Sequence, residues 1–91
     1  MSVARITTLN FKEKSGADQI EETYKTIAPT EFSEAEQLLE IRVDETTLIF
    51  VSLYADNDAM ERASATRKKR MDLNKDLINS MDGKTGEVIL N

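Results

Sequence analysis

Residues 47–54, Thr-Leu-Ile-Phe-Val-Ser-Leu-Tyr, are rich in β-branched and aromatic side chains and predict a β-strand. Side chains on a strand point alternately to its two faces, and here both sets are apolar: Leu48, Phe50 and Tyr54 on one face, and Ile49, Val51 and Leu53 on the other. A strand with one face in water should instead alternate apolar with polar residues. We therefore expect this strand to be covered on both faces.

Three further strands are predicted around this one. Residues 35–43 form a strand that Asp44-Glu45-Thr46 joins to residues 47–54, a length suited to a hairpin. Residues 3–10 alternate well enough for a first strand. Residues 85–90 form a short closing strand after a turn at Asp82-Gly83.

Two helices are expected between these strands. The first begins near Ser15, which can cap it together with Asp18, and ends at Pro29. Its inner positions are Ala17, Ile20, Tyr24, Ile27 and Ala28. The second begins at Asp56-Asn57-Asp58, which supply cap candidates, with Asp58 paired to Glu61 as a capping box, and it runs on without Gly or Pro. Its inner positions are Met60, Ala63, Met71, Leu77, Ile78 and Met81.

The resulting βαββαβ order predicts the ferredoxin-like α+β fold. Both helices then cover one face of a four-stranded antiparallel sheet whose first and third strands are central. The other face is bare, and leaving three large apolar side chains exposed there forgoes roughly 1.5–3 kcal/mol each. That is a large part of the roughly 5–15 kcal/mol that stabilises a small domain. We expect a second copy to cover this face, giving a homodimer through the sheet faces. The alternatives are a C-terminal segment folded over the face, or pairing of strand edges.

Composition narrows the functional classes. The 91 residues suit one domain, and the absence of Cys and His removes thiol and imidazole chemistry and the usual metal ligands, so no metal or cofactor is expected. The net charge of −5 counts against nucleic-acid or anionic-membrane binding. No apolar run approaches the roughly 20 residues of a membrane span, and no leader pattern opens the chain. We expect a cytoplasmic protein.

The sharpest local charge feature is the run Arg-Lys-Lys-Arg at 67–70. Successive helical residues lie about 100° apart, so the four cannot all face one ligand. We expect a solvated face that pairs with acids of the first helix such as Glu21 and Glu22. Arg67 best fits an inward position, because it lies four residues after Ala63 and four before Met71.

Two further arginines, Arg5 and Arg42, lie on predicted strands. Lining a pocket or an interface is one reading of these residues, since Arg suits bidentate pairing there. Pairing across strands is the favoured reading, with Glu36, Glu40 or Glu87 as partners.

The chain resembles the dimeric α+β barrel superfamily, especially its antibiotic-biosynthesis-monooxygenase-like domains. The resemblance covers nearly the whole chain. It consists of the element order, the short length, a two-sided third strand that runs into Ala55-Asp-Asn-Asp-Ala-Met-Glu61, and a long second helix followed by a short strand. It implies a face-to-face dimer, with a small-molecule cavity between helices and sheet in each protomer.

The resemblance also implies candidate site residues for a small organic ligand. These candidates are Asn10, Tyr24, Tyr54 and Arg67. Haem breakdown, known among relatives, uses an Asn of the first strand with a Trp and a His, and this chain has neither of the latter two. Cofactor-free oxygenation with Asn10 and a tyrosine is the enzymatic reading. For both tyrosines, core packing is the favoured structural reading.

Two functional classes therefore stay in view: a monooxygenase-like enzyme without a bound metal, and a non-enzymatic ligand-binding or structural dimerisation module. A cavity of roughly 300 Å³ or more with convergent polar groups favours the enzyme, and a filled interior favours the module. An RNA-binding domain shares the element order. Its third strand should carry a basic start and stacking rings, whereas this one begins Thr47-Leu48-Ile49.

Overall fold

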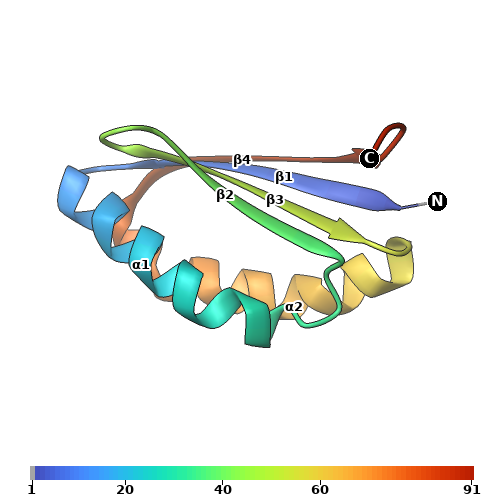
Figure 1. Cartoon of the computed structure of the whole chain (residues 1–91). Coiled ribbons are helices and arrows are strands. Elements are labelled where there is room, and N and C mark those ends of the chain that lie inside the picture. The colour runs from blue at the N-terminus through green and yellow to red at the C-terminus, as the bar shows by residue number, and fades with distance from the viewer. Residues whose placement is uncertain (1) are drawn as a thin grey trace.

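The computed structural model describes residues 2–91. Within them, four strands form one antiparallel sheet in the order β2-β3-β1-β4, with both helices on one face (Figure 1). The strands are β1 (Val3–Phe11), β2 (Gln37–Asp44), β3 (Thr47–Tyr54) and β4 (Ile78–Glu87), and the helices are α1 (Lys14–Glu31) and α2 (Asn57–Leu73). This confirms the predicted βαββαβ order and the central placement of β1 and β3.

Strand β3 has the predicted bounds and the predicted apolar residues on both faces. On the face toward the helices, Leu48 is 0% and Tyr54 is 2% exposed, and Phe50 is also buried. On the other face, Ile49 and Val51 are partly buried, whereas Leu53 near the end of the strand is buried. The helix-facing side chains contribute to the core.

The face of the sheet away from the helices is apolar and open in the single chain. In the strand register, Ile6 and Leu39 both lie opposite Val51, and Ile41 lies opposite Ile49, so these side chains share one face. Large apolar residues of this face have exposed fractions of 42–53%: Ile6, Leu39, Ile41 and Val43. We call these four residues the open-face patch.

Helix α1 ends later than the sequence predicts. Pro29 lies inside its last turn, and the backbone N–H of Phe32 still donates to the carbonyl of Ala28 at 2.8 Å. Proline removes one helical hydrogen bond, but Ala28 and Phe32 are both buried, and their packing keeps the last turn helical. Ser15 is not the cap: Glu13 holds that position and makes no side-chain cap bond.

Helix α2 ends earlier than predicted. At its start, the side chain of Asp56, and not that of Asp58, accepts a hydrogen bond from the Ala59 backbone at 2.8 Å. At its end, the Asn74 backbone N–H donates to the carbonyls of Arg70 and Met71. The Asn74 side chain also donates to the Arg70 carbonyl at 2.9 Å. Asn74 therefore provides hydrogen bonds to two backbone carbonyls of the last turn, those of Arg70 and Met71.

Strand β4 is the largest departure from the sequence prediction. After a 3₁₀ turn, Lys75–Leu77, the chain pairs with β1 from Ile78, so the predicted helical positions of Ile78 and Met81 were wrong. Asp82 and Gly83 do not turn; they pair with Thr8 and Thr7. The predicted 85–90 strand therefore runs over Ile78–Glu87 instead. Pairing along the whole of β1 gives the backbone N–H and C=O groups of this segment hydrogen-bond partners. The free energy gained in this way outweighs the local helix propensity of these residues.

Candidate ligand-binding cavity

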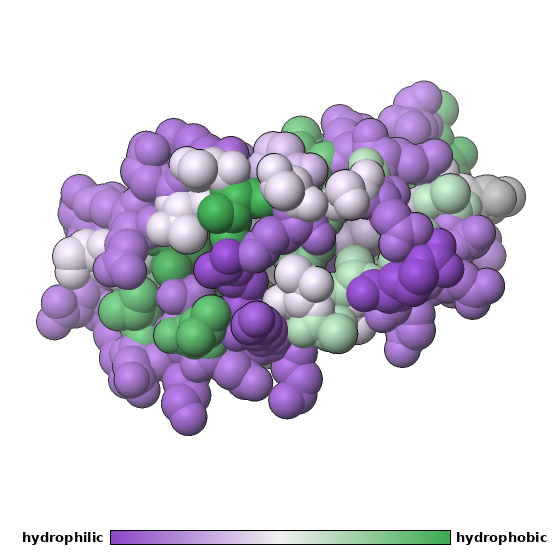
Figure 2. Space-filling model, turned by 90° about the horizontal axis from the view of Figure 1, so that it is seen from below, coloured by the Kyte–Doolittle hydropathy of each residue, from purple (hydrophilic) through white to green (hydrophobic). Residues whose placement is uncertain are grey.

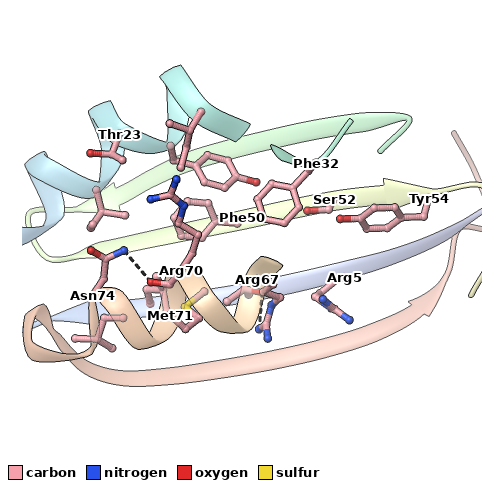
Figure 3. Close-up of a pocket in the computed structure, with 16 residues that line it drawn as sticks. Arg5, Thr23, Phe32, Phe50, Ser52, Tyr54, Arg67, Arg70, Met71 and Asn74 are labelled. Carbon is pink, nitrogen blue, oxygen red and sulfur yellow. Dashed lines mark hydrogen bonds between the residues drawn. The ribbon is translucent and has the colours of Figure 1, made fainter. Parts of the chain in front are cut away.

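A cavity of about 70 Å³ lies between the sheet and the two helices (Figure 3). Its apolar lining comprises Leu9, Ile20, Ile27, Phe32, Phe50, Met71 and Ile78. Its polar lining comprises Arg5, Thr7, Thr23, Tyr24, Ser52, Tyr54, Arg67, Arg70 and Asn74. From the helix side, apolar atoms are visible between the polar side chains of the surface (Figure 2). The cavity thus combines apolar walls with hydroxyl and guanidinium groups.

Arg67 reaches this cavity from α2. It lies on the same face of the helix as buried Ala63, and its Nη2 donates to the Thr7 hydroxyl of β1 at 3.1 Å. Burial lowers the pKa of Arg67, and the positive charge of Arg5 lowers it further. Arg67 is therefore a half-buried cation held between α2 and the centre of the sheet.

Arg5 lines the cavity from the neighbouring position of β1. Arg5 and Thr7 share the helix-facing side of the strand, and Arg5 Nη2 donates to the Ser64 hydroxyl of α2 at 2.8 Å. The expected pairing of Arg5 with a glutamate across the strands was wrong. Its side chain reaches a helix instead, as the figure shows beside Arg67 (Figure 3).

The two tyrosines also line the cavity. The Tyr24 ring packs at a tilt against Phe50, with centroids 4.5 Å apart, and lies 6.3 Å from the ring of Phe32. Burial raises the pKa of Tyr24, and the side chain of Ser52 partly opposes this shift. Tyr54 is buried at the end of β3. Both residues combine core packing with a place in the cavity lining.

Asn10 does not join the other three candidates. It lies near the end of β1, and its side chain bridges neighbouring strands: Nδ2 donates to Ser80 Oγ at 3.1 Å, and Oδ1 accepts from Thr47 Oγ1 at 3.0 Å. The strand alternation places Asn10 on the same face as Ile6, opposite to Arg5 and Thr7. The expectation that Asn10 lines one cavity with Tyr24, Tyr54 and Arg67 is therefore not met.

Among the polar lining residues that the sequence analysis did not name as candidates, Ser52 and Thr7 do have a signal in the sequence. Ser52 is the polar residue among Leu48, Phe50 and Tyr54 on the helix-facing side of β3. Thr7 lies on the helix-facing side of β1, opposite Phe50, and is buried. A hydroxyl in an otherwise apolar stripe marks a place where the interior holds a polar partner.

Ion pairs fix the helices around the cavity. Arg70 of α2 binds Glu31 of α1, with Nε 2.7 Å from Oε2, and Arg62 binds Glu34 with two nitrogens. The predicted partners of the basic run, Glu21 and Glu22, were therefore wrong for Arg70. The bidentate geometry links α2 to the end of α1 and to the segment after it.

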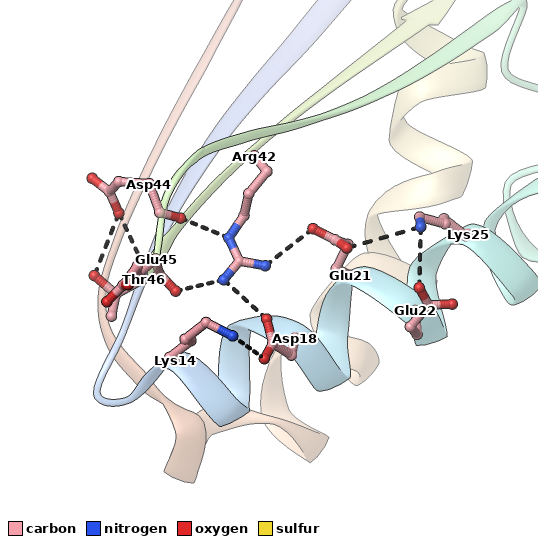
Figure 4. A network of polar contacts seen from close by, with 9 residues as sticks. All are labelled: Lys14, Asp18, Glu21, Glu22, Lys25, Arg42, Asp44, Glu45 and Thr46. Atoms are coloured by element: carbon pink, nitrogen blue, oxygen red, sulfur yellow. Dashed lines mark hydrogen bonds and ion pairs between the residues drawn. The ribbon is translucent and has the colours of Figure 1, made fainter.

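Arg42 forms the second polar network, at the hairpin between β2 and β3 (Figure 4). Its guanidinium contacts Glu21 at 3.0 Å and Asp18 at 3.1 Å, both on α1, and donates to the carbonyls of Asp44 and Glu45. The expected cross-strand pairing of Arg42 was therefore also wrong. The network attaches the hairpin to the first half of α1.

Glu40 of β2 is a carboxyl group without a partner. Its Oε2 is buried and makes no hydrogen bond with any residue in 2–91. Burial, reinforced by the charge of Glu21, raises the pKa of Glu40 to about 7. Its charge also contributes to the raised pKa of Tyr24. A proton on Glu40 is thus linked to the environment of the cavity wall.

Within residues 2–91, no cluster of three or more acidic side chains suited to a metal ion is present. None of the helices in this part of the chain is both long and apolar enough to span a membrane.

The order and pairing of the elements define a ferredoxin-like α+β fold. No family model and no curated protein matches the chain. Solved structures do match, and the three described next are 5–12% identical to this chain.

Three of these structures illustrate the likeness. A dimeric ferredoxin-like protein from an uncultured marine organism has a TM-score of 0.79 at 9% identity, covering 99% of this chain and 90% of that one. A putative antibiotic biosynthesis monooxygenase from Chloroflexus aurantiacus has a TM-score of 0.77 at 5% identity, covering 100% and 96%. SnoaB, a cofactor-independent oxygenase from Streptomyces nogalater, has a TM-score of 0.68 at 12% identity, covering 99% and 95%. At these identities the likeness establishes the fold.

Proposed function

We propose that this chain is a cytoplasmic, homodimeric α+β barrel domain that binds a small organic molecule between its sheet and helices. The observation that carries the proposal is the cavity, where Tyr24, Tyr54 and Arg67 place polar groups among apolar walls. Such a combination is typical of small-molecule sites. The volume of about 70 Å³ is far below the roughly 300–1,000 Å³ of drug-sized sites, so the ligand is small.

The open-face patch supports the dimer. Ile6, Leu39, Ile41 and Val43 are each at least 42% exposed and lie on one face of one sheet. Covering large apolar side chains stabilises a protein by roughly 1.5–3 kcal/mol each, and a second copy brings a patch of the same shape. Two solved structures with this fold are described as dimeric ferredoxin-like proteins. A monomer in sedimentation experiments at tens of micromolar protein would contradict the dimer.

A structure of the protein purified from its own host tests the ligand. We expect density for a small molecule in contact with Tyr24, Tyr54 or Arg67. An interior that holds no such density in any copy would contradict the ligand-binding role. The Tyr24→Phe and Arg67→Gln variants, purified in the same way, should lose ligand occupancy. The matched control is Arg62→Gln, which changes an exposed arginine of α2 and should keep the occupancy of the wild type.

Cofactor-free oxygenation is the second candidate function. It is favoured by the shared fold with a protein described as a cofactor-independent oxygenase, and by polar groups that can stabilise a substrate anion. Without a cofactor the substrate supplies all four electrons, as when O2 converts a CH2 group to C=O and water. The cavity of about 70 Å³ falls short of the roughly 300 Å³ that would favour an enzyme, and it is too small to enclose a polycyclic substrate.

An oxygen electrode tests this second candidate. Small enolisable carbonyl compounds should consume dissolved O2 faster with the wild type than with Arg67→Gln. Equal rates with the wild type, the variant and buffer would leave the non-enzymatic binding module as the function.

A further inference from the structure

The arginines of residues 2–91 divide into two groups. Arg42, Arg62 and Arg70 each bind a carboxylate. Arg5 and Arg67 form no ion pair in this part of the chain, and each donates instead to a neutral hydroxyl, Ser64 for Arg5 and Thr7 for Arg67. These two line the cavity together, so positive charge without a compensating carboxylate is concentrated there.

Two neighbouring cations without a counter-charge are an unfavourable arrangement. Both guanidiniums are half-buried, and burying a charge without an opposite charge carries a desolvation penalty. Their like charges also repel, which is visible in the lowered pKa of Arg67 beside Arg5. A guanidinium has five N–H donors, and one hydroxyl uses only one of them. An anion between the two arginines would satisfy the remaining donors and neutralise charge.

The rest of the lining restricts the kind of anion. The cavity walls also include the rings of Phe50, Phe32 and Tyr24. A hydrated inorganic ion would make no apolar contact with these rings, whereas a ligand with a hydrocarbon part would. By the same measure of volume one water molecule needs roughly 10–15 Å³, so a cavity of about 70 Å³ has room for about five to seven water-sized groups. A carboxylate group with a short hydrocarbon part fits both the charge and the space.

We propose that the small molecule of this cavity is a short-chain monocarboxylate, bound by Arg5 and Arg67 through its carboxylate and by Phe50 through its hydrocarbon part. The inference rests on the small-molecule role proposed above and names the chemical class of its ligand.

Calorimetric titration of the wild-type protein with propionate and butyrate, and with the amides of the same shape, tests the charge. We expect the carboxylates to bind about ten- to hundredfold more tightly than their amides, the effect of losing a charge-assisted contact. Arg5→Gln and Arg67→Gln should each weaken carboxylate binding by a similar factor. Arg62→Gln, which removes an exposed arginine of the same helix, should leave binding unchanged.

The remaining outcomes overturn the inference. Equal binding of amides and carboxylates would show a neutral-ligand site, and would leave the small-molecule role standing. Inorganic phosphate or nitrate bound as tightly as butyrate would show a general anion site. No binding of the carboxylate series also rejects the inference, while density for a different molecule in host-purified protein would still support the small-molecule role. Circular dichroism of each variant at the titration temperature confirms that loss of binding does not come from unfolding.

Discussion

Arg70 on α2 binds Glu31 on α1 through a two-point ion pair beside the cavity, and the two side chains are only 34% and 28% exposed. The hydrogen bonds between the two side chains, with their opposite charges as a smaller cause, lower the pKa of Glu31 and raise the pKa of Arg70. Partial burial and bidentate geometry distinguish this pair from the more exposed Lys68–Asp72 pair on the same helix. It therefore fastens the two helices where they border the cavity.

Breaking this pair should loosen the helices. We expect Arg70→Ala to lower the free energy of unfolding by about 1 kcal/mol, and a double-mutant cycle with Glu31→Ala to give a coupling of about 0.5–1 kcal/mol. Urea denaturation of the four proteins measures both quantities. Lys68→Ala is the matched control, with an expected change within about 0.5 kcal/mol. A coupling of zero would show that the pair does not fasten the helices.

Glu40 should make stability depend on pH. Its pKa in the folded protein is about 7, above the ordinary value of 4.5, so the folded state keeps a proton that the unfolded chain releases. The stabilisation is complete below pH 4.5, declines as the pH rises through the window from 4.5 to 7, and is lost above it. With allowance for solvent screening of a partly exposed carboxyl, the loss is about 1–2 kcal/mol.

The Glu40→Gln variant tests this assignment. It should be more stable than the wild type at about pH 8 and similar at about pH 4, where the wild-type carboxyl is neutral too. Thermal unfolding across this range gives the difference between the two proteins. A difference that is the same at both ends of the range would rule out Glu40 as the titrating group.

A charge on the open-face patch should dissociate the proposed dimer. Ile41 is 45% exposed in the single chain and lies near the middle of this patch, so Ile41→Glu places a carboxylate in the apolar interface. Sedimentation velocity should change from dimer to monomer. The control is Leu73→Glu, because Leu73 is 66% exposed but lies at the end of α2, away from the sheet face. Dissociation by both variants, or by neither, would contradict an interface at the open-face patch.

Replacing Arg67 by an apolar residue should not destabilise the ligand-free protein. Arg67→Met removes a half-buried charge that has no carboxylate partner in residues 2–91, and it keeps a flexible chain of similar length. We expect the free energy of unfolding to stay the same or to rise by about 1 kcal/mol, measured by denaturant titration at low salt. A loss of more than about 2 kcal/mol would show that Arg67 is held for stability and not for a ligand.

Local patterns predicted the central part of the fold. The run of β-branched and aromatic residues predicted the bounds of β3 correctly. The assignment of its side chains to two faces was also predicted, because successive side chains of a strand point to opposite faces. The missed boundaries depend on contacts distant in sequence. Pro29 stays helical because Ala28 and Phe32 are buried, and Asp82-Gly83 stays extended because β1 is its partner. The residues adjacent in sequence indicate neither this burial nor this strand pairing.

The site was predicted in part for a similar reason. Helical spacing identified Tyr24 and Arg67, since both lie on stripes that face the sheet. Asn10 was placed with them through its position at the end of the first strand, but alternation sends its side chain to the opposite face. For Arg5, the sequence favours a glutamate on a neighbouring strand as the partner. Arg5 in fact contacts Ser64, which lies 59 residues away in sequence. This contact depends on how α2 crosses the sheet, which local sequence patterns do not show.

The composition of β4 bears on how the molecule avoids aggregation. This strand lies at an edge of the sheet and leaves one row of backbone groups free to pair with another chain. Its ten residues, Ile-Asn-Ser-Met-Asp-Gly-Lys-Thr-Gly-Glu, include three charges and two glycines and only two large apolar side chains. Charges and glycines weaken edge-to-edge pairing at β4. The opposite edge, β2, carries more apolar residues, so this protection applies to one edge of the sheet only.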